Sequence, residues 1–228
     1  MKALLYKEFK LAMHPICYVF IFAFPLMILI PSYPIAIGFI YILSCYPVLF
    51  LGANKGQQSN DLLYSTLLPV RKKDIVLARI ITVIIMQATF MLLTSALVPL
   101  AYYIQNNIQA SGETVENAGL GLNGFVSTLA IVVVGYALAD LIFFPIYYKN
   151  GKSIVMSTLF TIFGFVVYIS ILTIAFPYIP GFEGYVNALA NVNIGIQFIY
   201  LAGAIVISFL LHLLVYKISS KRLEQVDF

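Results

Sequence analysis

The sequence predicts an all-α polytopic membrane protein with six transmembrane helices, and three observations support this fold class. First, 62% of the 228 residues are hydrophobic and only 10% are charged, whereas soluble domains usually have about 25% charged residues. Second, the apolar residues gather in long segments that short polar stretches separate. Third, all 13 Lys and Arg residues fall in segments that can face one side of a membrane, as the positive-inside tendency requires.

Six apolar segments predict six spans, since a transmembrane helix needs about 20 residues, including its flanks. We expect the spans at residues 16–30, 35–53, 75–103, 125–148, 153–176 and 194–216. The first segment is short, and Pro31–Pro34 separates it from the second. If both formed one span, the N-terminal lysines would lie across the membrane from Arg71–Lys73, against the positive-inside tendency. Two spans joined by an outer turn keep both basic clusters inside.

Residues 1–14 predict an amphipathic helix that lies in the inner membrane interface, as basic amphipathic helices do. The polar side of its helical wheel is formed by Lys7, Lys10 and His14. Glu8 is out of place because it falls on the apolar side, and Pro15 is expected to turn the chain into the bilayer. The alternative, a signal peptide, is disfavoured because no A-x-A-like cleavage site follows the first apolar segment.

Residues 56–74 form the longest polar interruption between the apolar segments, and we expect a cytoplasmic loop that contains a short helix. Its residues 59–61, Ser-Asn-Asp, can cap a helix N-terminus. Pro69 ends the helix, because the residue before a proline is disfavoured in the α region. The apolar face of this helix is formed by Leu62, Leu63 and Leu67. The basic run Arg71–Lys73 keeps the loop on the inner side.

Two other connections are expected on the outer side. Residues 105–123 contain Glu113 and Glu116 but no Lys or Arg, which fits an outer loop. Residues 177–193 are either a surface loop or a partly re-entrant turn, and the sequence leaves both open. With six spans, both termini lie in the cytoplasm, and the basic tail after residue 216 agrees with that side.

Asp140 is the only acidic residue inside a predicted span. An ionisable residue at membrane depth is a functional hypothesis by default, for example a proton or cation site. A structural role competes with it, because Asp140 lies about two turns from Lys149 and can pair with a basic residue there. We favour the structural role. Together with Gln87 in the third span, Asp140 forms the candidate intramembrane polar site.

No pattern in the sequence predicts catalysis or nucleotide binding within this chain. Residues 151–153, Gly-Lys-Ser, spell the end of a phosphate-binding loop. The full motif needs a glycine where Ile146 stands and a strand where a membrane span is predicted. His14 and His212 are isolated in the sequence, and no Ser, His and Asp residues have the spacing of a catalytic triad.

Other binding classes are disfavoured as well. The basic residues sit between apolar segments, where they orient the chain in a membrane, so nucleic-acid binding is not expected. Cys17 and Cys45 have neither disulfide nor metal-ligand spacing, and we expect no metal site. The absence of an internal repeat disfavours an inverted-repeat transporter. Gly135 and Ala139 have the small-xxx-small spacing that allows close approach of two helices.

The order of these elements resembles the ABC-2 type permease family over nearly the whole chain. Residues 68–79, LPVRKKDIVLAR, are similar to the family's L-P-V-x-R-x-x-I-V-x-x-R pattern, with the basic residue displaced. Residues 145–152, PIYYKNGK, are similar to its P-x-x-Y-K-x-G-x-x-K turn, with the last lysine shifted. In size and style, the chain is most similar to permeases that export phenol-soluble modulins and antimicrobial peptides.

The resemblance implies a permease subunit in a bacterial plasma membrane that moves an amphipathic or hydrophobic substrate, such as a peptide, out of the cell. Two copies, as a homodimer surrounded by lipid, would pair with two separate ATPase subunits. ATP and Mg²⁺ would bind to the ATPase, so this chain would hold no cofactor and would not itself be an enzyme. In the family, the short helix between spans two and three is the coupling helix that docks on the ATPase. That role would fall to Gln57, Ser59, Asn60, Asp61, Leu62, Leu63, Tyr64 and Leu67.

Two alternatives to an ABC permease remain open on the sequence. A stand-alone secondary transporter or channel would use Asp140 and Gln87 as the polar residues of its pathway. A membrane sensor or scaffold would bind a partner through the loop 56–74 and transport nothing. Co-purification of a stoichiometric ATPase partner would distinguish an ABC permease from both of these alternatives.

Overall fold

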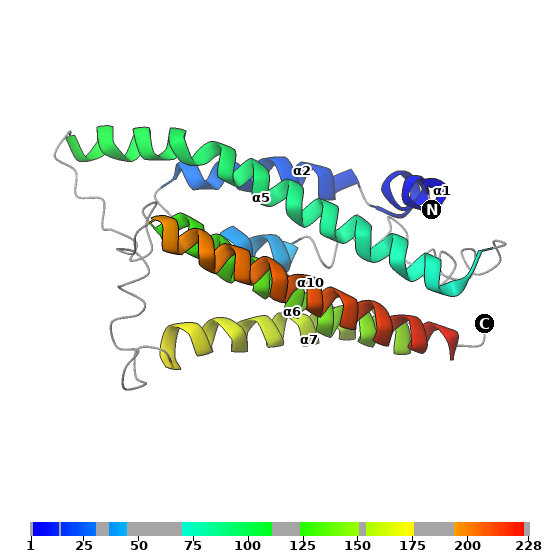
Figure 1. The fold of residues 1–228 in the computed structure, drawn as a ribbon. Coiled ribbons are helices and arrows are strands. Elements are labelled where there is room, and N and C mark those ends of the chain that lie inside the picture. The colour runs from blue at the N-terminus through cyan, green and yellow to red at the C-terminus, as the bar shows by residue number, and fades with distance from the viewer. Residues whose placement is uncertain are drawn as a thin grey trace.

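The computed structural model describes residues 2–13, 15–30, 37–44, 70–110, 124–150, 154–175 and 194–225. Within these ranges every regular element is helical and none is a strand, so the all-α prediction is confirmed. The long helices run roughly along one direction, and both ends of the chain lie at the same end of the bundle (Figure 1).

The helices follow one another along the chain with loops between them. Their bounds are α1 (Lys2–Lys7), η1 (Glu8–Ala12), α2 (Pro15–Ala23), η2 (Phe24–Leu29), a helix over 37–44, α5 (Lys72–Ala110), α6 (Phe125–Asn150), α7 (Ile154–Ser170), η4 (Ile171–Ala175) and α10 (Ile194–Glu224). Each of the six predicted spans therefore contains helical residues.

Three of the described helices are long and apolar enough to cross a membrane: Lys72–Ile104, Phe125–Lys149 and Ile194–Glu224. The bent pair Lys2–Lys10 and Pro15–Leu29 makes a fourth if it forms one span. Helix α7 is apolar but shorter. The chain is thus a multi-pass membrane protein, while the count of six spans stays a prediction.

Helices α5 and α10 extend beyond the predicted spans. The third span was expected to end at residue 103 and the sixth at residue 216, yet α5 continues to Ala110 and α10 to Glu224. The reason is that polar residues end a membrane span but need not end a helix. The polar extensions contain neither Gly nor Pro, the residues that most weaken a helix, so the helices continue through them.

The N-terminal segment turns sharply where the sequence predicts it to. The axes of Lys2–Lys10 and Pro15–Leu29 differ by 82°. Met13 is extended between the two helices, and its backbone N–H donates to the carbonyl of Glu8 at 3.0 Å. Residues 2–12 therefore lie across the direction of the bundle, as the end-on view of α1 in Figure 1 shows. Their place in the membrane interface remains a prediction.

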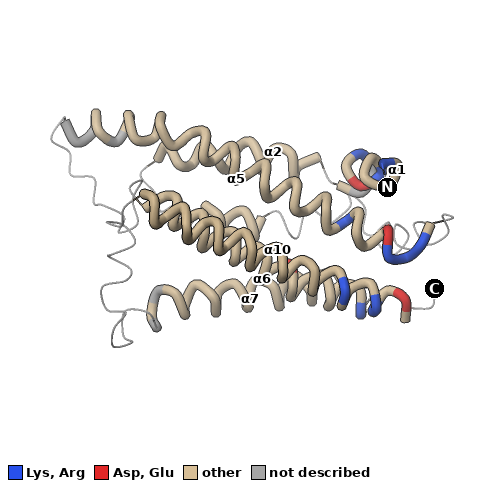
Figure 2. The backbone as a smooth tube through the Cα atoms, viewed as in Figure 1, with Lys and Arg blue, Asp and Glu red and all other residues tan. Residues whose placement is uncertain are grey.

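The Lys and Arg residues of the described ranges gather at the end of the bundle that holds both termini (Figure 2). Lys and Arg residues there come from α1, from the first turns of α5 and from the last turns of α10. This one-sided arrangement agrees with the predicted distribution of basic residues. Within the described ranges, the opposite end of the long helices contains no Lys or Arg.

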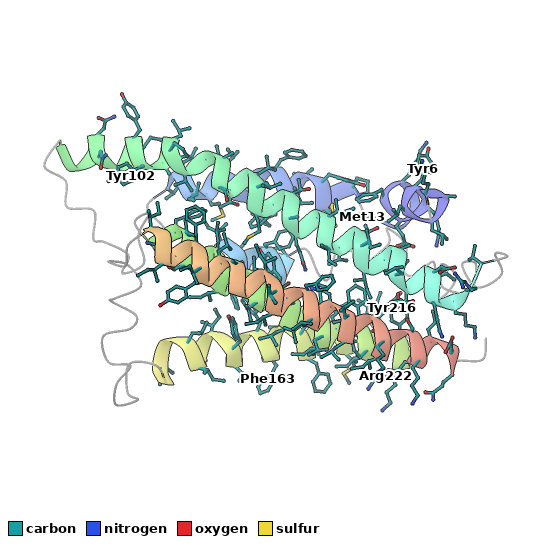
Figure 3. All side chains as sticks on the ribbon, viewed as in Figure 1. Tyr6, Met13, Tyr102, Phe163, Tyr216 and Arg222 are labelled. Carbon is teal, nitrogen blue, oxygen red and sulfur yellow. The ribbon has the colours of Figure 1, made fainter. Side chains whose placement is uncertain are left out.

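Helix α6 lies at the centre of the bundle, where aromatic side chains from three helices fill the core. Tyr41 of the helix over 37–44 packs against Phe90 of α5, with ring centroids 4.4 Å apart, and against Tyr136 of α6 at 5.4 Å, both in tilted arrangements. All three rings are buried. Offset aromatic pairs at such distances stabilise beyond the area they bury. Outward-facing side chains are apolar too, for example Phe163 of α7, which points away from the other helices (Figure 3).

Gly135 allows α6 and α7 to approach closely, as its small-xxx-small spacing with Ala139 suggests. A Cβ atom at Gly135 would lie 2.8 Å from Cε2 of Phe165 and 3.1 Å from Cε1 of Tyr168. The hydroxyl of Tyr168 donates to the carbonyl of Ile131 at 2.9 Å, which fixes that ring over α6. Neither ring can therefore retreat without losing contacts with α6.

Substituting Gly135→Leu should destabilise the fold by about 1–3 kcal/mol, the usual cost of overpacking a well-packed contact. Gly203→Leu is the matched control, because a Cβ at Gly203 of α10 meets nothing within 4 Å. Thermal unfolding of the purified variants in detergent measures both. Equal destabilisation of the two variants would show that α6 and α7 do not pack through Gly135.

Candidate functional site

The predicted coupling helix, Gln57–Leu67, lies outside the described residues. The structure describes the chain again from Val70 onward, where the loop enters α5. Arg71 caps this entry: its Nε donates to Oδ2 of Asp74 at 3.1 Å, and its backbone carbonyl accepts from the Asp74 N–H at 2.9 Å. The candidate site is therefore built from what holds the first turns of α5.

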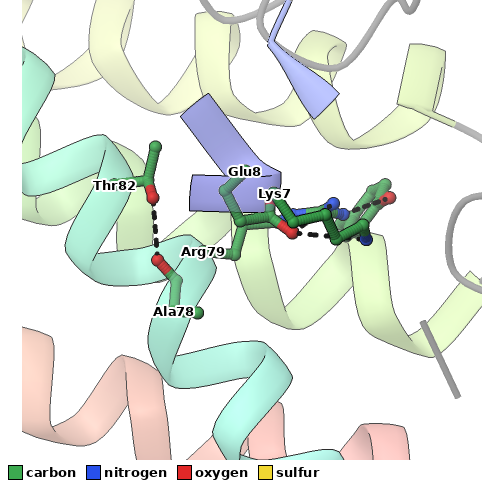
Figure 4. A network of polar contacts seen from close by, with 6 residues as sticks. Lys7, Glu8, Ala78, Arg79 and Thr82 are labelled. Carbon is green, nitrogen blue, oxygen red and sulfur yellow. Dashed lines mark hydrogen bonds and ion pairs between the residues drawn. The ribbon is translucent and has the colours of Figure 1, made fainter. Parts of the chain in front are cut away.

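A buried ion pair joins the start of α5 to the N-terminal segment. The Nε atom of Arg79 donates to Oε2 of Glu8 at 2.8 Å, and its Nη2 donates to Oε1 at 3.2 Å. Lys7 adds a third positive contact, with its Nζ 3.6 Å from the same Oε1 (Figure 4). Both side chains of the main pair are at most 5% exposed. Such two-pronged Arg–carboxylate pairs fix geometry as well as charge.

Arg79 also reaches the central helix of the bundle. Its Nη1 donates to the hydroxyl of Tyr147 on α6 at 3.1 Å, and its guanidinium carbon lies 6.0 Å from the Tyr147 ring centroid. One guanidinium therefore connects η1, α5 and α6. We call Glu8, Arg79 and Tyr147 the inner joint.

The inner joint corrects the interpretation of two residues. Glu8 was out of place on an apolar helix face, and no partner was predicted for Arg79, which lies early in the third span. The structure shows instead that each is buried as the partner of the other, because a buried carboxylate needs a cation and hydrogen-bond donors. The two are 71 positions apart. The sequence did contain a signal for this pair, because Glu8 is a lone acid on an apolar helix face and Arg79 is a lone base early in a predicted span.

The end of α10 is attached to the same region. Lys73 of α5 and Glu224 of α10 form an ion pair with Nζ and Oε1 3.3 Å apart. Nη1 of Arg222 donates to the carbonyl of Pro145 on α6 at 2.6 Å. The first turns of α5 are thus joined to η1, α6 and α10, all at the end where the loop 56–69 enters.

A second polar cluster lies deeper in the bundle and contains both residues of the predicted intramembrane polar site. Nε2 of Gln87 on α5 donates to Oδ2 of Asp140 on α6 at 3.0 Å. His212 of α10 faces the same oxygen, with its Nε2 also at 3.0 Å. The Asp140 side chain is 0% exposed and that of His212 is 12% exposed. We call Asp140, Gln87 and His212 the buried polar cluster.

His212 is isolated in the sequence, but in the structure it is not isolated, because it faces Asp140. It is 72 positions from Asp140 along the chain, so no local spacing links them. Asp140 was expected to pair near Lys149, but its described bonds go to Gln87 and His212. The cluster lies about 12 Å from the inner joint along α5, at 1.5 Å per residue. Within the described residues, no group of three or more His, Cys, Asp and Glu side chains could hold a metal ion.

The model of a known protein family, described as ABC-2 family transporter protein, matches residues 3–223 of the chain. The match includes every helix described above and the loop between the helix over 37–44 and α5. No curated protein and no solved structure matches the chain.

Arg79→Met should destabilise the fold by about 3–5 kcal/mol, because the buried Glu8 carboxylate loses its two-pronged partner and keeps only the longer contact to Lys7. The matched control is Arg71→Met, which removes a pair whose arginine is 85% exposed and should change stability by at most about 1 kcal/mol. Denaturant unfolding in mixed micelles gives both values. Similar losses in the two variants would contradict a buried pair at Arg79.

Proposed function

Because the chain belongs to the ABC-2 transporter family, we propose that it couples ATP hydrolysis by a separate ATPase subunit to the export of an amphipathic or hydrophobic substrate, such as a peptide. At the level of the family, it is a multi-pass permease of an ABC transporter. The ATPase docking residues, the direction of transport, the substrate and the homodimer are the parts we propose.

The observation that carries the coupling proposal is the attachment of the start of α5. The proposed docking helix would end just before Pro69, and α5 begins at Lys72. Close to that point, the half-exposed Lys73 contacts Glu224, and two turns later the buried Arg79 holds Glu8. A helix fixed in this way moves as one body with its partners, since packed interiors do not deform continuously. A displacement of the loop by the ATPase would therefore be transmitted to η1, α6 and α10 together.

The apolar outer surface supports the proposed substrate class and a second copy of the permease. Of the three helices able to cross a membrane, α10 has 11% of its most apolar window buried, against 56% for the other two. Its large exposed side chains, including Phe198, Ile199 and Phe209, need lipid or protein cover. An amphipathic peptide that enters sideways from the inner leaflet would meet surfaces of this kind.

A stand-alone transporter with Asp140 in its pathway is less well supported. The Asp140 side chain is fully buried by the bundle and is bonded by Gln87 and His212. A pathway residue needs a route by which a solute can reach it. The buried polar cluster thus favours helix association over a pore.

Leu63→Glu and Leu67→Glu should weaken association with the ATPase subunit by more than about tenfold, because each places a charge on the proposed apolar docking face. Membrane insertion should be unchanged. Asn54→Glu, in the same connection but outside the docking helix, is the control. Co-purification and ATP hydrolysis of the reconstituted complex measure the effect. Wild-type coupling in both leucine variants would make the segment an interfacial helix only.

The substrate proposal has a separate test. Amphipathic helical peptides added to the reconstituted permease–ATPase complex should stimulate ATP hydrolysis, since substrate engagement and hydrolysis are coupled in the proposed function. Lipids and small hydrophobic drugs at the same concentration are the controls. If the drugs stimulate hydrolysis and the peptides do not, the peptide class is wrong while the permease assignment stands.

A further inference from the structure

The distances between the nitrogen and oxygen atoms of the buried polar cluster indicate which of these atoms carry hydrogens. Nδ1 of His212 lies 2.7 Å from the backbone carbonyl oxygen of Ser208, one turn earlier on α10. A carbonyl oxygen only accepts hydrogen bonds. Nδ1 therefore carries a hydrogen and donates it, and the Ser208 hydroxyl at 3.3 Å from Nδ1 is a longer, secondary contact.

The other ring nitrogen then faces an acceptor. With a hydrogen on Nδ1, a neutral imidazole presents a bare lone pair at Nε2. This atom lies 3.0 Å from Oδ2 of Asp140, which in an ionised carboxylate also only accepts. Two acceptors at hydrogen-bond distance need a proton between them. It sits either on Nε2, giving imidazolium and carboxylate, or on Oδ2, giving imidazole and carboxylic acid.

Gln87 fits both arrangements. Its Nε2 donates to the same Oδ2 of Asp140 at 3.0 Å, and a carboxyl oxygen has a second lone pair to receive that bond. The amide therefore holds Asp140 toward His212 without itself supplying the missing proton.

The surroundings favour keeping the proton. With it, Asp140 and His212 together carry no net charge. Without it, a net negative charge would remain on a pair whose side chains are 0% and 12% exposed, and burying a net charge is costly.

Neighbouring groups do not replace the proton. The nearest described cations along the three helices are Arg79, which is bound to Glu8, and the exposed Lys149 and Lys217. All three lie on the order of 7 Å or more away along a helix axis. The titratable groups one turn away on the packed helices are Tyr136 of α6 and Tyr216 of α10. Neither tyrosine offers a positive charge.

We propose that Asp140 and His212 form an intramembrane proton-binding site, in which one bound proton joins α10 to α6 and, through Gln87, to α5. The ligand is a proton, and its loss would leave a net negative charge on Asp140 and His212 between the helices. Occupancy of the site therefore controls how firmly α10 is held. The proposal rests on the three helices alone and is independent of the transported substrate.

Nuclear magnetic resonance of the full chain in lipid nanodiscs tests the site directly. The chain has two histidines, so His14→Gln leaves His212 as the only one for ¹⁵N labelling. Carboxyl ¹³C labelling of aspartate, assigned with Asp140→Asn, reports the other partner. At pH 7 we expect either hydrogens on both His212 nitrogens or a neutral His212 beside a protonated Asp140. A neutral His212 beside an ionised Asp140 overturns the proposal.

Stability against pH provides a second readout. Above about pH 6.5 an unfolded histidine has lost its proton, whereas the folded site keeps one, so unfolding releases a proton. The folding equilibrium constant should then fall about tenfold per unit of rising pH until the folded site deprotonates. Asp140→Asn/His212→Gln should lack this slope, and His14→Gln should retain it. Equal slopes for wild type and the double variant between about pH 7 and 8 overturn the proposal.

Discussion

The Glu8–Arg79 ion pair is the contact on which the arrangement of the described helices depends most. It is buried, it is two-pronged, and it joins a segment lying across the bundle to the helix that follows the predicted coupling loop. Apolar packing also determines how the helices fit together, as at Gly135. A buried ion pair adds a stricter condition, because any other position would leave a charge without a partner.

The same constraint acts a second time in the interior of the bundle. Gln87, Asp140 and His212 come from three helices and meet at one oxygen atom. Between the two polar levels, the core contains buried aromatic side chains of α6 such as Phe143 and Phe144. Two polar contacts along one pair of helices determine rotation and register together. We infer that α5, α6 and α10 move as a unit, as a coupling function requires.

Much of the fold could be predicted from the sequence, because hydropathy and charge are local properties. The all-α class, the one-sided basic residues and the turn near Pro15 needed only segments of the chain. The partners of Glu8 and His212 could not be predicted, since they are 71 and 72 positions away. Helix ends were missed for a different reason: α10 continues to Glu224 through a polar stretch that contains no helix breaker.

In the proposed mechanism, the loop before α5 receives a motion from an ATPase and transmits it to a bundle held by the inner joint. Photo-cross-linking from Leu63 in intact cells tests this most directly, because it reports what that position touches without changing its polarity. We expect an adduct with a subunit that carries an ATP-binding domain, and we expect it to depend on expression of that subunit. Adducts with lipid alone, in cells that contain the ATPase, would contradict the account.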